Sequence, residues 1–76
     1  MITKNDISHE NSRYICRITA PTESKAKELA IKALIPARAI SVTGEVTNSG
    51  QTIIVDTDSR DATLKISNCI LSLLNN

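Results

Sequence analysis

The residues that could carry chemistry in this 76-residue chain are few, and their spacing assembles neither a catalytic centre nor a metal site. His9 is the only histidine, so a Ser-His-Asp or Cys-His arrangement is not expected. The carboxylates of Asp56, Asp58 and Asp61 cluster, but they lack the glycine and the distal glutamate of a calcium loop. We therefore predict that the chain is not an enzyme and that it holds no metal or other cofactor.

The two cysteines, Cys16 and Cys69, both lie within apolar stretches and form no CxxC pair. The polar segment 1–12 contains no apolar signal-peptide region, and no apolar run approaches the length of a membrane span. Disulfides are rare in the cytosol. We expect two reduced, buried thiols in a cytoplasmic protein that does not contact a membrane.

Charge and aromatic content argue against nucleic acid as the main ligand. The formal net charge is only +1, whereas strong phosphate binding needs a basic face. Tyr14 is the only aromatic residue, and RNA-binding sheets usually stack bases on several. The GxxG clamp of KH-type RNA-binding domains is absent as well. A stand-alone RNA-binding module of KH-like build nevertheless stays open as the alternative function, because the size and the mixture of elements suit one.

Alternating apolar residues predict three strands. They cover residues 13–19, 39–47 and 51–57, and the last is apolar on both faces, as is typical of a central strand. A short hairpin loop joins the second strand to the third, with Gly50 in a left-handed conformation. Gly44 falls on the apolar face of the second strand and marks a bulge or a close backbone approach.

Apolar residues at helical spacing predict two helices. The first covers residues 23–35 and ends at Pro36, since proline lacks the N–H group that a helix interior needs. The second begins at a cap provided by Asp58 or Ser59 and runs to about Leu74.

The order of elements is strand, helix, strand, strand, helix, which predicts an α+β two-layer sandwich. In this β-α-β-β-α arrangement the third strand inserts between the other two, so the antiparallel sheet has the order 1-3-2 and both helices cover one face. We expect one domain over residues 13–76. Residues 1–12 should form a flexible N-terminal tail, which could join the sheet near its end.

The last helix is more apolar than one sheet requires. Its apolar arc includes Cys69 as well as Ile66 and Ile70, and Leu64 and Leu71 widen it beyond the roughly 100° stripe that faces a core. On the first helix, Ile31 and Ile35 lie outside the main core stripe. These leucines and isoleucines are either scattered surface residues or the borders of a groove that receives partner helices. We favour the groove.

Oligomerisation is the expected source of additional stability for so small a domain. The first and second strands are both edges of the sheet. Strand 39–47 is the longer and carries only one charged residue, so we predict it as the seam of a dimer. The residues assigned to this dimer edge are Ala39, Ser41, Thr43 and Glu45.

Three segments together resemble the smallest, dimer-forming subunit of the KEOPS complex. They read ICRITAPTESKAKELAIKAL at 15–34, ISVTGEVTNSGQTIIVDTD at 40–58 and LKISNCILSLL at 64–74. Lys65 stands where the family usually has an arginine, and the turn before the last helix is longer than usual. Both the standard subunit and a diverged paralogue, which pairs with the standard subunit in a heterodimer, therefore stay open.

The resemblance implies a non-catalytic scaffold within an assembly that makes N6-threonylcarbamoyladenosine in tRNA. It implies a homodimer or a heterodimer with a paralogue, whose helices bind the threonylcarbamoyl-transferase subunit, with tRNA as a further component of the complex. The residues assigned to partner binding are Ile31, Ile35, Leu64, Lys65, Asn68 and Leu71.

Overall fold

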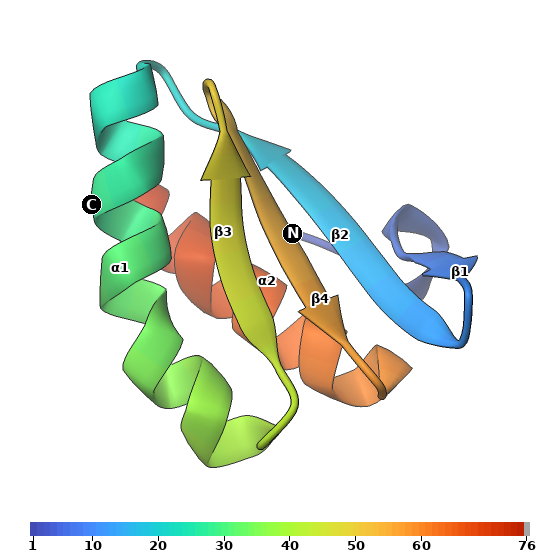
Figure 1. The fold of residues 1–76 in the computed structure, drawn as a ribbon. Helices are drawn as coiled ribbons and strands as arrows, with labels where there is room; N and C mark the ends of the chain where they lie inside the picture. The colour runs from blue at the N-terminus through green and yellow to red at the C-terminus, as the bar shows by residue number, and fades with distance from the viewer. Residues whose placement is uncertain (76) are drawn as a thin grey trace.

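Two helices pack on one face of an antiparallel sheet in the computed structural model, which describes residues 1–75 (Figure 1). Asn76, the last residue of the predicted domain, lies outside the described residues. In chain order the elements are η1 (Lys4–Asp6), β1 (Ser8–Glu10), β2 (Arg13–Thr19), α1 (Glu23–Ile40), β3 (Glu45–Ser49), β4 (Thr52–Thr57) and α2 (Arg60–Leu74).

The sheet has four strands in the order β1-β2-β4-β3. The predicted order of the three longer strands is confirmed, with β4 in the centre, but the prediction of three strands is wrong. Ser8–Glu10 in the expected tail pairs with β2, because Asn11 and Ser12 make a two-residue turn with positive φ angles of 51° and 65°. Ile7 is buried in the core and holds this segment in place.

The helix α1 continues through Pro36, where the sequence predicted its end. Pro36 removes one N–H group from the helix, but Ala37 behind it is fully buried, and the Ser41 N–H donates to the Ala37 carbonyl at 2.8 Å. Burial of Ala37 and this bond stabilise the last turn. The predicted strand over 39–47 is correspondingly wrong, because its first residues are helical and β3 begins only at Glu45.

The turns around β3 depend on two glycines. Gly50 has φ 59°, as predicted for the hairpin between β3 and β4. Gly44 precedes β3 and approaches the preceding loop closely, since a Cβ atom there would lie 3.2 Å from the Ser41 carbonyl oxygen. Of the two alternatives predicted for Gly44, close backbone approach is the one observed.

The core lies between the sheet and the two helices. The central strand contributes Ile53 and Val55, and α2 contributes Ile66 and Ile70, all fully or almost fully buried. The helix α1 packs mainly alanines, which lets it approach the sheet closely. Its buried residues are Ala26, Leu29, Ala30, Ala33 and Ala37.

A short chain of buried hydroxyls fixes the start of α2 against the sheet. The Thr57 and Thr63 hydroxyls lie 2.8 Å apart, and the Thr63 hydroxyl also donates to the Tyr14 carbonyl of β2 at 2.8 Å. The Thr57 hydroxyl also lies 2.6 Å from the Ser59 carbonyl, and it can donate its single proton either to this carbonyl or to the Thr63 oxygen. This network joins β2, β4 and α2 where the core meets the end of the sheet. It was not predicted from the sequence.

Candidate protein-binding surface

The outer side of α1 carries the most exposed large apolar side chains of the two helices. Ile31 is 68% exposed, Ile35 82% and Leu34 40%. Ile31 and Ile35 were predicted to lie off the core stripe, and the structure confirms it. Leu34 was assigned to the core stripe and is instead open to solvent, because the alanines on either side of it already bring α1 into contact with the sheet.

Part of this apolar surface continues onto β3. Ile31 and Leu34 line a hollow between α1 and β3, and Figure 1 shows the two elements side by side. The strand contributes Val46 at the floor of the hollow, with Thr47 and Asn48 beside it. Because β3 is the last strand of the sheet, alternate backbone N–H and C=O groups along it point away from β4.

The opposite edge of the sheet is different, because β1 covers β2. The register pairs Ser8 with Ile15 and Glu10 with Arg13. Of the two edges expected to be open, the edge of β2 is therefore occupied along part of its length. Within residues 1–75, β3 is the longer of the two strands that now end the sheet.

The predicted dimer-edge residues are mostly not on a strand. Ala39 lies in the last turn of α1, and Ser41 and Thr43 lie in the loop that follows, while Glu45 alone begins β3. The edge strand therefore has to be assigned to Glu45–Ser49. The sequence placed it too early because the alternation of apolar residues continues through the end of the helix and the loop.

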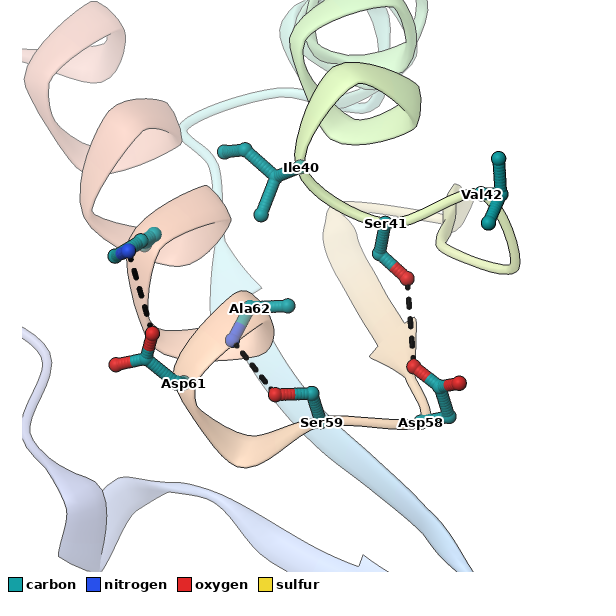
Figure 2. A pocket seen from close by; sticks show the side chains of 8 residues that line it. Ile40, Ser41, Val42, Asp58, Ser59, Asp61 and Ala62 are labelled. Atoms are coloured by element: carbon teal, nitrogen blue, oxygen red, sulfur yellow. Dashed lines mark hydrogen bonds and ion pairs between the residues drawn. The ribbon is translucent and has the colours of Figure 1, made fainter.

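A second hollow lies where the end of α1 faces the start of α2 (Figure 2). Its polar groups are already engaged with one another: the Ser59 hydroxyl accepts the Ala62 N–H at 3.4 Å, and Lys65 pairs with Asp61 at 3.3 Å. These contacts cap and stabilise α2. No group of three or more metal-ligating side chains occurs among the described residues.

The predicted partner-binding residues of α2 all make contacts within the chain itself. Leu64 and Leu71 are half-buried and pack against the core. The Asn68 side chain accepts the Ile2 N–H at 2.9 Å and donates to the Ile2 carbonyl at 3.2 Å. Lys65 is exposed and pairs with Asp61. None of these residues lines the hollow that holds Ile31, so the structure does not bring the two predicted pairs into one groove.

The two thiols also differ. Cys16 is buried on β2 as predicted, whereas Cys69 is exposed on α2, and the prediction of a buried thiol there is wrong. The side of α2 that faces the sheet carries Thr63 and Ser67 together with Ile66 and Ile70. Small polar residues therefore occupy part of the core face, and Cys69 is turned outward.

The two arginines of the open sheet face are paired with carboxylates. Arg13 contacts Asp56 at 2.7 Å, and Arg17 contacts Glu10 at 3.4 Å. On α1, hydrogen bonds from Lys32 and Lys25 hold the pKa of Glu28 below its ordinary value. The two strand arginines are thus already neutralised within the chain, which does not favour this face as a phosphate-binding surface.

Within residues 1–75, no helix combines the length and apolar character needed to cross a membrane. No protein-family model, curated protein or solved structure matches the chain.

Proposed function

We propose that this chain is a non-catalytic scaffold subunit that pairs β3 with a second copy of itself and binds further protein chains through α1. The observation that carries the proposal is the exposure of Ile31, Leu34 and Ile35 beside the open edge of β3. Exposed apolar residues gathered next to an unpaired strand are typical of a protein–protein interface.

The geometry suits a two-fold assembly. Antiparallel pairing of two β3 strands would continue the sheet across the axis and satisfy the outward backbone groups. The same pairing would bring the two copies of α1 alongside each other. Ile31 and Leu34 of one copy would then cover Ile31 and Leu34 of the other. Full burial of a leucine or isoleucine side chain contributes about 1.5–3 kcal/mol, so four such side chains provide a substantial driving force.

Ile35 is 82% exposed and does not line the hollow beside β3, so it remains available to another partner. The resemblance to the smallest KEOPS subunit suggests which partner this is, namely helices of the threonylcarbamoyl-transferase subunit. In this proposal the chain acts in the cytoplasm, as the standard subunit or its paralogue, and supports threonylcarbamoylation of tRNA without contributing a catalytic group. A heterodimer with a paralogue would use the same β3 edge.

Co-purification with the transferase subunit tests the proposal. Ile35→Glu should weaken binding by roughly 30-fold or more, the effect of removing an interface hot spot of about 2 kcal/mol. The matched control is Ser24→Glu, which places the same charge on an exposed position of α1 about 16 Å along the helix axis. Equal binding by both variants would contradict the proposed partner surface. Binding of tRNA by the isolated chain, unaffected by either variant, would instead support the RNA-binding alternative.

A further inference from the structure

The N-terminal residues 1–10, here called the strap, bind to the rest of the domain through contacts at three places. β1 pairs with β2, the Ile7 side chain is buried in the core, and the Ile2 backbone is held by the Asn68 side chain. The His9 ring also stacks on the Tyr14 ring, with centroids 4.4 Å apart. The strap therefore occupies a formed site made by β2, the core and α2.

This site recognises both the backbone and the side chains of the strap. Asn68 accepts the N–H and donates to the C=O of Ile2, and the Ile2 side chain packs, partly buried, against the core. The edge of β2 likewise pairs with backbone groups of Ser8–Glu10. Ile7 is the one strap side chain that the core buries. An identical strap from a second chain would make all the same contacts.

The turn that holds the strap in its own domain is strained. Asn11 and Ser12 both have positive φ, and a two-residue turn of this kind prefers glycine at its second position. Asparagine tolerates this conformation, whereas serine adopts it at a cost. Straightening the turn would relieve the strain and join β1 and β2 into one continuous strand over residues 8–19.

We propose that the strap exchanges between two copies of this chain, with Asn11 and Ser12 as the hinge. In the exchanged state each strap occupies the β2 and Asn68 site of the other copy, so the contacts of the closed state are kept and the turn is relaxed. Short strained hinges favour such exchange. This interface is separate from the proposed β3 seam, because it uses β2 and α2 and leaves β3 free.

Engineered disulfides across β1 and β2 test the proposal. His9 and Tyr14 are directly opposed in the register, at a separation that suits a disulfide. In chains carrying Cys16→Ala and Cys69→Ser, one chain receives His9→Cys and a tagged second chain receives Tyr14→Cys. A disulfide yield between the two chains above the level of random collision requires the strap of one chain to lie on β2 of the other. Both substitutions in a single chain provide the control for folding, and His9→Cys mixed with Ser24→Cys measures random collision.

Three versions of the hinge complete the experiment. With the native hinge we expect the interchain disulfide above the collision control. Ser12→Gly, which relaxes the closed turn, should lower its yield about fivefold or more. Deletion of Asn11 and Ser12 should raise the yield to near the level that random pairing of the two chains allows. Equal yields from the native and Ser12→Gly hinges would overturn the proposal. So would the absence of an interchain disulfide in the deletion variant when the double-cysteine chain with the native hinge closes its own disulfide. Ile31→Glu, which should disrupt the β3 seam, should leave the yield of the interchain disulfide unchanged. The experiment therefore distinguishes failure of strap exchange from failure of the proposed β3 dimer.

Discussion

The two helices lie on the same face of the sheet, yet they expose their apolar residues in opposite ways. The sequence of α2 is the more apolar, but Leu64, Leu71 and Leu74 all pack against the core. The sequence of α1 has a narrower apolar stripe composed mostly of alanine, and it leaves Ile31 and Ile35 largely in solvent. The helix with the wider apolar arc is therefore not the helix with the larger free apolar surface.

The difference arises from what covers each helix. The helix α2 packs against β2, β4 and α1, and its Asn68 also holds Ile2 of the strap. The helix α1 lies beside β3, where the sheet ends, so the side chains that point past β3 have no further element to meet. The amount of apolar surface that each helix leaves exposed therefore follows from its position relative to the sheet edge, and not from the width of its apolar arc.

Thiol labelling should give the largest contrast. Cys69 lies on the uncovered side of α2 and should react with an alkylating reagent at nearly the rate of a free thiol. Cys16 is buried and becomes reactive only on unfolding, so its rate should be lower by on the order of a thousandfold or more. Mass spectrometry of the labelled peptides measures both rates. Protection of Cys69 in the single chain would mean that α2 is covered more completely than described.

Truncation of the core side of α2 should have the largest effect on stability. Ile66 is 1% exposed, so Ile66→Ala should lower the free energy of unfolding by roughly 2–5 kcal/mol. The matched variant on α1 is Ile35→Ala, at a surface position where changes are typically within about 0.5 kcal/mol. Denaturant titrations compare the two directly. Similar losses would show that Ile35 contributes to the core.

Truncation of Leu71 tests whether this side chain of α2 packs against the core or anchors a partner. Because this side chain is half-buried against the core, Leu71→Ala should lower the free energy of unfolding by about 1–2 kcal/mol, between the values for Ile66 and Ile35. The same variant should keep its affinity for the transferase subunit. A stable Leu71→Ala protein that no longer binds would restore the earlier interpretation of Leu71 as a partner anchor.

Acidification should slightly weaken the attachment of the strap. Hydrogen bonds from the Thr3 backbone and hydroxyl hold the pKa of Asp6 below its ordinary value. A lowered folded-state pKa stabilises the fold above the unfolded-state value, and this contribution is lost as the pH falls through the folded-state pKa. Amide exchange at Thr3, corrected for the intrinsic pH dependence, should therefore become relatively faster in acid. The Asp6→Asn variant should lack this pH dependence; its persistence there would refute the assignment.

Most of the fold follows from local patterns in the sequence. Alternation predicts β2, an apolar run predicts β4, and Gly50 marks the hairpin. Of the two predicted caps of α2, Asp58 and Ser59, Ser59 is the one observed, and its hydroxyl accepts the Ala62 N–H. These features depend on residues close together in the chain. The same local patterns also predicted that Ile31 and Ile35 would lie off the core stripe.

The errors have long-range causes. Pro36 predicts a helix end from local chemistry, but burial of Ala37 in the core carries α1 one turn further and thereby displaces the start of β3. The strap joins the sheet through a turn without glycine and through the contact of Ile2 with Asn68, which lies 66 residues away in sequence. Leu71 packs partly buried against the core, so its role as a partner anchor stays a prediction.

Light scattering at micromolar concentration gives the mass of the isolated chain in solution. This mass directly tests whether the chain associates through α1 and β3. The measurement should use Ser12→Gly as the parent, because this substitution reduces the contribution of strap exchange. We expect twice the mass of one chain for this parent. The Ile31→Glu derivative should have the mass of a single chain, with both proteins folded to the same extent. A monomeric parent, or a derivative that remains dimeric, would contradict association through α1 and β3.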